Sequence, residues 1–331
     1  MPLLPACPTA AAYQAIEHDK RLFLPAVQAI AAAHGLSAPV AEDALDASDV
    51  VYRVGASHVL KLVAPPFHEE LARECAALAR VALSVPTPKV IARGQLEGWP
   101  YFLMTRVGGV PASELWRDLT LAEQRALIAE LGSIVAELPD HSAGTRDPFP
   151  GAAWDAFIEA SRAGFARRCA RWKMDPESVA QLERWMDDVL ESPGLPRADA
   201  LVHGDLTTGN VHLEYRDGHL RVAAIVDFGD ARIGPRLYEL VTPLAFYCRG
   251  NRELSRALFK GFALHTSAER DLVRPLMALS LLHPFNSLDR WCGWCNVERR
   301  DYTHSQAGID CLARRLILGD EAEPARAGPS S

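Results

Sequence analysis

The feature that most restricts the fold of this 331-residue chain is one polar segment with a second, shorter one seventeen residues beyond it: Val202-His203-Gly204-Asp205-Leu206-Thr207-Thr208-Gly209-Asn210 and Asp227-Phe228-Gly229. Each polar residue alone would suit an ordinary turn. Their order, and their position after apolar, strand-like runs, instead indicate one site. Asn210 and Asp227 carry the hard oxygen atoms that Mg²⁺ prefers, and Asp205 can accept a proton. These residue types match phosphoryl transfer, which depends on a metal ion and an aligned nucleophile more than on covalent chemistry.

The segment suggests a role for each of its polar side chains. We expect Asp205 to orient a substrate hydroxyl and to take its proton late in the reaction. Asn210 and Asp227 are expected to hold Mg²⁺ against the phosphates. His203 is expected to brace the loop rather than to react, and we group it with the cofactor-binding residues.

The first third of the chain has the pattern of a small lobe built from strands and helices. Alternating β-branched and apolar residues predict four strands, at 50–54, 58–63, 89–93 and 99–105. Helical spacing of apolar residues predicts helices at 21–34 and 68–83.

Beyond Gly108 and Gly109 the spacing of apolar residues becomes mainly helical. Helical runs cover 121–138, 154–170, 179–190 and 237–317, and short strands are predicted at 211–215 and 220–226. We therefore expect a bilobal α+β protein. Its parts are an N-terminal nucleotide-binding lobe with a helical extension (1–105), a helical catalytic and substrate-binding lobe (106–318) and a disordered tail (319–331).

The segment from His203 to Asn210, with Asp227 beyond it, resembles the catalytic loop of the aminoglycoside phosphotransferase family. In that family the loop begins His-Gly-Asp, carries an Asn five residues after the Asp, and precedes a metal-binding Asp on the next strand pair. The resemblance extends over most of the chain. It implies a protein-kinase-like fold, with ATP or GTP as the phosphoryl donor and Mg²⁺ as the cofactor.

The resemblance also implies residues that handle the nucleotide. Lys61, in the run Val59-Leu60-Lys61-Leu62, is similar to the family's nucleotide lysine, and Glu74 is similar to the Glu that pairs with it. Glu69 and Glu70 lie one helical turn earlier and compete for that pairing. We prefer Glu74 because the apolar residues around it place it beside a buried face of the helix.

Two further segments are expected to meet the nucleotide. Met104 and Arg106 fall where the hinge between the lobes would pass the adenine or guanine ring. The turn before residue 50 lacks the glycines of a protein-kinase phosphate loop, although Ser48 could offer hydrogen bonds there. Asp46 and Asp49 would repel phosphates unless they point away.

The acceptor is expected to be a small molecule that carries a hydroxyl group. Gly204 and Thr207 stand where many protein kinases carry Arg and Lys, and only a short segment separates Gly229 from the next helical pattern. Three runs resemble the hygromycin B phosphotransferase branch, at 225–228, 236–240 and 249–253.

A cationic aminocyclitol would be held by carboxylates of the helical lobe. The candidates are Asp155, Glu239, Asp289, Glu298 and Asp301. Each of them would otherwise be a solvated or capping carboxylate, the usual state of an acidic side chain.

Two other functions stay open at this stage. A metabolic kinase for a sugar or an amino alcohol would use the same phosphate-handling residues, because specificity lies in the variable helical lobe. A catalytically inactive nucleotide-binding protein is the second alternative, although all the chemically competent residue types are present.

The charge balance argues against some partners. The formal net charge is -7, with 35 Lys and Arg against 42 Asp and Glu, so the chain lacks the basic excess that nucleic-acid binding requires. No run approaches the roughly 18 to 20 apolar residues that span a bilayer, and the N-terminus has no basic start. We therefore expect a cytoplasmic protein, a monomer or weak dimer, without nucleic-acid or membrane partners.

The cysteines predict packing rather than chemistry. Seven of them, an odd number scattered along the chain, indicate reduced thiols. Cys292 and Cys295 have C-x-x-C spacing, but they lie in a helical region rather than after a strand, which argues against a redox pair. A zinc site that adds His283 and His304 is a weaker alternative.

Overall fold

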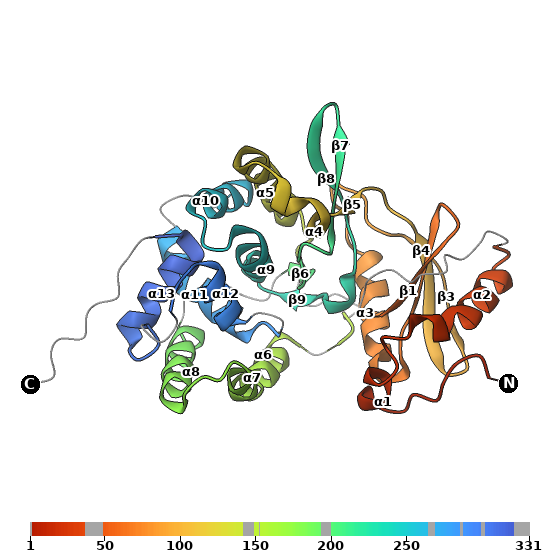
Figure 1. The fold of residues 1–331 in the computed structure, drawn as a ribbon, viewed down its shortest axis with the longest axis horizontal. Coiled ribbons are helices and arrows are strands. Elements are labelled where there is room, and N and C mark those ends of the chain that lie inside the picture. Colours follow the sequence, from red (N-terminus) through yellow and green to blue (C-terminus); the bar gives the residue numbers. More distant parts are fainter. Residues whose placement is uncertain are drawn as a thin grey trace, which may run out of the picture.

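The computed structural model describes residues 2–36, 49–141, 149–151, 153–192, 200–263, 269–284, 287–298 and 302–320. Figure 1 shows a strand-rich end, formed by the N-terminal part of the chain, and a larger helical end. The bilobal α+β architecture expected from the sequence is therefore confirmed.

An antiparallel sheet of four strands forms most of the N-terminal end. In sheet order the strands are β1 (Val50–Val54), β2 (His58–Leu62), β4 (Trp99–Thr105) and β3 (Val90–Leu96). The β1–β2 turn is tight because Gly55 adopts a φ of 61°, in the left-handed region that favours glycine. Both hairpins expected from the alternating pattern are present.

The two faces of this sheet meet different helices. These are α1 (Ala10–Gln14), η1 (Lys20–Phe23), α2 (Leu24–Ala33), η2 (Pro65–Phe67) and α3 (His68–Leu78). One face, with Tyr52 and Leu60, packs against α1, η1 and α2 in one apolar cluster. The other face, with Val59 and Phe102, packs against α3. Because alternate residues of a strand share a face, Lys61 lies on the face of Val59 and projects toward α3.

Two small sheets lie where the chain passes into the helical end (Figure 1). Their strands are β5 (Val110–Pro111), β7 (Val211–Arg216) and β8 (His219–Ile225) in one, and β6 (Ala200–Val202) and β9 (Arg232–Gly234) in the other. The segment 203–210 connects β6 to β7, and Asp227 follows β8 after one residue. The Val226 N–H donates to the carbonyl oxygen of Asn210 at 3.0 Å, which brings the end of the loop to the end of β8.

The rest of this lobe is helical. Its longer helices are α5 (Leu121–Ala136), α6 (Trp154–Ala163), α7 (Phe165–Arg171), α8 (Pro176–Leu190), α10 (Arg252–Gly261), α11 (Glu269–Leu282), α12 (Leu288–Trp294) and α13 (Gln306–Leu318). Its short helical segments are α4 (Ala112–Leu115), η3 (Trp116–Asp118), η4 (Phe228–Asp230), η5 (Arg236–Leu240), α9 (Val241–Pro243) and η6 (Leu244–Cys248). Helices α5 and α10 cross closely because Gly261 has no side chain: a Cβ there would lie 2.0 Å from the carbonyl oxygen of Ala129.

The long helical run predicted over 237–317 is divided into several shorter elements. The chain turns at Arg249 and Gly250, whose φ angles are 48° and 73°, and Asn251 then caps α10 by accepting two backbone N–H groups. The run predicted over 154–170 divides likewise at Gly164. Apolar periodicity identifies the buried faces but not the points where caps and left-handed residues interrupt them.

One predicted helix ends early, and most of the predicted tail lies outside the described residues. Helix α3 stops at Leu78, short of the predicted end at residue 83. Residues 321–331 of the predicted tail lie outside the described residues. Among the helices that the structure describes, none combines the length and apolar character needed to cross a membrane.

Candidate active site

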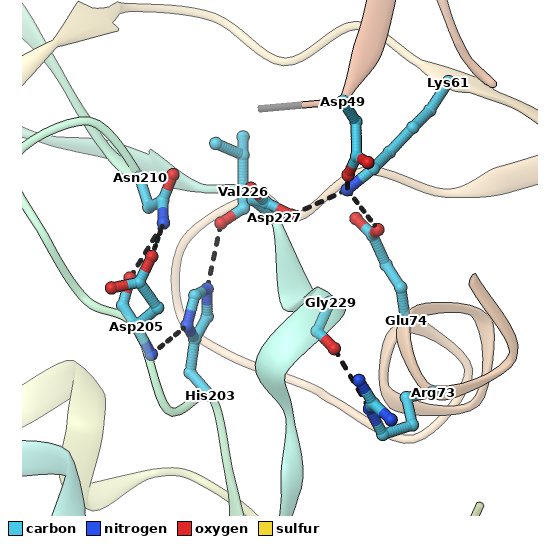
Figure 2. Close-up of polar contacts among 10 residues, drawn as sticks. All are labelled: Asp49, Lys61, Arg73, Glu74, His203, Asp205, Asn210, Val226, Asp227 and Gly229. Carbon is cyan, nitrogen blue, oxygen red and sulfur yellow. Dashed lines mark hydrogen bonds and ion pairs between the residues drawn. The ribbon is translucent and has the colours of Figure 1, made fainter. Parts of the chain in front are cut away.

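Lys61 lies at the centre of a cluster of carboxylates between the sheet and α3 (Figure 2). Its side chain is only 6% exposed, and its Nζ lies 2.8 Å from Glu74 Oε2, 2.8 Å from Asp227 Oδ1 and 2.9 Å from Asp49 Oδ2. Burial alone would lower the pKa of Lys61, but the surrounding carboxylates, Asp227 foremost, raise it well above its usual range. The ammonium group is therefore charged and surrounded by negative partners.

Glu74 is the acidic residue that α3 supplies to Lys61. It is 1% exposed, whereas Glu69 is exposed and Glu70 is partly buried. Burial raises the pKa of Glu74 to about 7, and the charge of Lys61 opposes that rise. The structure thus places Glu74, rather than either competitor, against Lys61.

His203 holds the start of the 203–210 loop against the end of β8. Its Nδ1 accepts the N–H of Asp205 at 3.1 Å, so its Nε2 carries the proton and donates to the Val226 carbonyl oxygen at 2.9 Å. Burial lowers the pKa of His203 to about 4, which keeps the ring neutral. The geometry agrees with a bracing role. It does not agree with our grouping of His203 among the cofactor-binding residues, because both ring nitrogens are engaged and the residue is 1% exposed.

Asp205 and Asn210 face each other across the loop (Figure 2). The Asn210 amide nitrogen donates to the carboxylate Oδ2 of Asp205 at 2.9 Å and to its carbonyl oxygen at 2.8 Å. The other carboxylate oxygen, Oδ1, is buried and has no hydrogen-bond partner among the described residues. Burial raises the pKa of Asp205 to about 7, and the nearby charges of Asp230 and Asp227 add to the rise. A carboxylate in this state is suited to proton transfer near neutral pH.

The backbone of Gly204, next to Asp205, is held from both sides by buried side chains. Its N–H donates to Glu239 Oε1 at 2.7 Å, and its carbonyl oxygen accepts from His283 Nε2 at 2.8 Å. Tyr247 adds a hydrogen bond from its hydroxyl to the Thr207 carbonyl oxygen at 3.0 Å. These contacts fix the main chain on which Asp205 is carried.

The prediction that Glu239 binds substrate is wrong. Its side chain is 1% exposed and points at the Gly204 N–H, inside the protein. Burial raises the pKa of Glu239 to about 7, and two backbone N–H groups, of Gly204 and His203, oppose that rise. A buried carboxylate that accepts a backbone N–H stabilises the loop and offers no surface to a ligand.

Asp227 takes a left-handed conformation, with φ of 63°, and its side chain is 39% exposed. Lys61 lowers the pKa of Asp227, so this carboxylate stays ionised while Asp205 is poised near neutrality. The oxygen donors of Asn210 and Asp227 suit Mg²⁺, which binds through one or two protein groups and completes its shell with phosphates and water. The residues therefore fit a magnesium ion.

The predicted hinge lies at the end of β4. Met104 is buried, and Arg106 is exposed just beyond the strand. The Arg106 N–H donates to the Ser57 carbonyl oxygen at 2.8 Å, which ties the connection between the lobes to the β1–β2 turn. Their predicted contact with the base remains a prediction.

The remaining predicted residues differ in their surroundings. Asp155 is exposed at the start of α6, at the edge of a hollow of about 300 Å³ that Glu159 and Glu191 also line. Asp289 is exposed in the first turn of α12, and Glu298 is exposed beyond that helix. Ser48 and Asp301 lie outside the described residues.

The C-x-x-C pair is part of the packing. Cys292 is buried, and Cys295 donates from its Sγ to the Arg249 carbonyl oxygen at 3.2 Å. Neither of the two is in a disulfide. His283, which the zinc alternative requires, is 1% exposed and bonded to Gly204, so that alternative does not agree with the structure.

Three contacts of the site did not follow from the sequence. His283 and Tyr247 reach the loop from 79 and 40 residues away, and no motif or spacing announces such contacts. Asp49 was expected to matter only as a repulsive charge, yet it contacts Lys61. One feature of the sequence could have predicted this contact: Asp49 comes just before an apolar strand that pairs with the strand of Lys61.

A family comparison agrees with this geometry. Residues 39–276, more than half of the chain, match the model of the phosphotransferase enzyme family. The chain therefore belongs to the phosphotransferase enzyme family, and the prediction of a phosphotransferase is confirmed.

Solved structures with the same fold include antibiotic-modifying enzymes. The GDP complex of aminoglycoside 2'-phosphotransferase-IIIa matches with a TM-score of 0.62 at 16% identity, over 88% of this chain and 98% of that one. An aminoglycoside phosphotransferase bound to GDP and kanamycin matches at 0.59 and 17%, over 78% and 89%. A ternary complex of another aminoglycoside phosphotransferase with streptomycin and ATP matches at 0.54 and 13%, over 85% and 98%. At these identities the likeness shows a shared fold, so the protein-kinase-like fold is confirmed.

Proposed function

We propose that this chain is an O-phosphotransferase that moves the γ-phosphoryl group of ATP or GTP to a hydroxyl of a small cationic molecule, with aminoglycosides such as hygromycin B as the favoured acceptors. The observation that carries the proposal is the state of Asp205. Its Oδ2 is held by Asn210, while its buried Oδ1 has no hydrogen-bond partner among the described residues. No described protein group occupies that oxygen, and in this proposal it accepts the proton of a substrate hydroxyl.

The other residues divide the remaining work. Lys61 supplies positive charge for the phosphates, and Glu74 orients its side chain. Asn210 and Asp227 would hold Mg²⁺, which neutralises charge on the transferring group when it is bound. The hydrogen bonds to Gly204 keep Asp205 fixed, so that positioning, the main contribution of such enzymes, is built into the loop.

The choice of a cationic acceptor has separate support. Asp155, Glu159 and Glu191 line one hollow in the helical lobe together with Arg162, so three carboxylates against one guanidinium would attract ammonium groups there. Structures with the same fold are complexes with kanamycin and with streptomycin. The hygromycin B assignment depends on the resemblance of three short runs, at 225–228, 236–240 and 249–253.

The test is a Mg²⁺-dependent phosphorylation assay with ATP and with GTP, against a panel of aminoglycosides that includes hygromycin B and a panel of sugars and amino alcohols. We expect turnover on one aminoglycoside. Asp205→Asn should lower kcat about 10²- to 10⁴-fold, the range for loss of a positioned acid–base group, and leave the nucleotide Kd unchanged.

Other outcomes of this assay separate the alternatives. Turnover confined to a sugar or an amino alcohol would replace the aminoglycoside proposal with a metabolic kinase. Nucleotide binding without turnover on any acceptor would favour an inactive nucleotide-binding protein. Similar, mild losses of kcat and of nucleotide affinity in Asp205→Asn would contradict the role given to Asp205.

A further inference from the structure

The cluster around Lys61 contains one acidic residue that the proposed reaction does not use, Asp49. An ammonium group has three N–H donors. Two of them are hydrogen-bonded, to Glu74 Oε2 and Asp227 Oδ1, both at 2.8 Å, and Asp49 Oδ2 forms an ion pair with Nζ at 2.9 Å (Figure 2). The third carboxylate, Asp49, therefore lies against the part of the ammonium group that Glu74 and Asp227 leave open, where a phosphate oxygen would compete with it.

The three carboxylates differ in how firmly the fold holds them. Glu74 is inside α3 and is 1% exposed. Asp227 follows β8 in a left-handed conformation. The residue before it, Val226, is fixed by the hydrogen bond from its N–H to the Asn210 carbonyl oxygen. Asp49 lies just outside the β1–β2 ladder, whose pairing begins at Val50. Asp49 can therefore leave Lys61 without breaking a helix or a strand.

The main chain at Asp49 is tied to the N-terminal helical extension. Lys20, in η1, donates from its Nζ to the carbonyl oxygen of Asp49 at 3.0 Å. The hydroxyl of Tyr52 in turn donates to the Lys20 carbonyl oxygen at 2.6 Å. The extension thus holds the backbone of Asp49 at the distance from which its side chain reaches Lys61.

We propose that the Asp49 carboxylate occupies, on Lys61, the place of a nucleotide phosphate oxygen, and that a bound nucleotide displaces it. The inference rests on the proposed function, because it takes Lys61 to bind the phosphates. A phosphate group and the Asp49 carboxylate are both negatively charged and repel each other when both contact the Lys61 ammonium group. The two therefore exclude each other from that contact. Nucleotide then binds only the fraction of molecules in which Asp49 has withdrawn, and its apparent affinity is lowered by that fraction.

The test compares the full chain with Asp49→Asn, which keeps the side-chain shape and removes the charge, and with Asp49→Ala. Isothermal titration calorimetry gives the Kd for ATP, GTP and inorganic tripolyphosphate, each with Mg²⁺ and with EDTA. We expect both variants to bind all three ligands about 10-fold more tightly in EDTA, within the usual range of coupling between two sites. Adenosine and guanosine, which lack phosphates, should bind wild type and variants equally.

The matched control is Glu69→Gln, which removes one negative charge from an exposed position of the same lobe and should bind like wild type. Equal affinities of wild type and both Asp49 variants for the phosphate ligands would overturn the inference. Weaker Mg²⁺-dependent binding by the variants would also overturn it, since Asp49 would then be a metal ligand. Absence of ATP and GTP binding by the wild type itself would instead overturn the proposed function, and the inference with it.

Discussion

Around Gly204 the protein directs buried side chains at main-chain atoms, whereas around Lys61 it directs carboxylates at one ammonium group. Glu239 and His283 bond the N–H and the carbonyl of Gly204 at 2.7 and 2.8 Å. On the other side of the site, the contacts of Lys61 are ion pairs with side chains from three separate segments.

This difference separates a fixed region from an exchangeable one. A hydrogen bond to the backbone keeps its geometry whether or not a ligand is present, because neither partner is a group that a ligand replaces. In an ion pair, a charged group of a ligand can replace one partner. Where one ammonium has several carboxylate partners, the remaining ones still stabilise its charge when one is lost. We therefore expect substitutions around Gly204 to abolish most of the activity, and substitutions around Lys61 to change the affinity for the nucleotide.

The largest effect should come from adding one methyl group at Gly204. Its φ is 84°, and a Cβ there would lie 2.8 Å from the carbonyl oxygen of Asp230, so Gly204→Ala must shift the backbone beside Asp205. A displacement of about 1 Å near the reacting atoms costs on the order of 10²-fold in rate. We expect at least that loss in kcat, together with a lower melting temperature, measured by assay and by calorimetry.

Gly218 provides the matched control for this substitution. Its φ is 78°, close to that of Gly204, but no atom lies within 4 Å of the position of a Cβ. Gly218→Ala should therefore cost only the backbone strain, about 1–2 kcal/mol, and leave kcat unchanged. If both alanine variants kept full activity, the loop would not be the fixed region that we describe.

The second effect is a pH dependence of stability from Glu239. Burial raises its pKa from 4.5 to about 7, so the folded state keeps a proton that the unfolded state has lost between these values. The stabilisation is complete below pH 4.5 and is lost as the pH rises toward 7. Relative to Glu239→Gln, which has no charge to bury, the wild type should lose on the order of 3 kcal/mol across this window.

Denaturant unfolding of both proteins between about pH 4.5 and pH 8 measures this difference, and subtraction cancels the groups that titrate alike in both. The difference should level off above pH 7. A constant difference across the whole range would mean that Glu239 is ionised in the folded protein, and that its hydrogen bond to Gly204 is charge-assisted.

The strands and the loop of the two regions could be predicted from the sequence, but the contacts that hold the loop could not. The strands around Lys61 follow from local alternation, and the 203–210 loop follows from a compact motif whose residues are close together in the chain. The resemblance to a family then added the pairing of Lys61 with Glu74, which the structure contains.

The contacts that hold the loop could not be predicted in this way. His283 lies 79 residues from Gly204, and its hydrogen bond depends on how α11 packs, which no local pattern encodes. Glu239 was misplaced because an acidic residue is expected on the surface, whereas here it is buried with its pKa raised and one of its oxygens bonded to a backbone N–H. The contact of Asp49 with Lys61 depends on the register between β1 and β2, which is set only when the sheet forms.

The smallest effect should come from Glu74→Gln, in the exchangeable region. Glutamine keeps an oxygen that can accept from Lys61, and Asp227 and Asp49 remain within 2.9 Å of its Nζ. We expect kcat/KM for the nucleotide to fall about 10-fold, as for loss of one charge-assisted hydrogen bond among several, with little change in melting temperature. Steady-state kinetics at saturating acceptor gives this value, and Glu69→Gln is the exposed control.

The direction of the change in nucleotide affinity is as informative as its size, because Glu74→Gln should weaken nucleotide binding while Asp49→Asn strengthens it. Weakening by both would make the two carboxylates equivalent supports of Lys61 and would remove the distinction between a partner that stays and a partner that leaves.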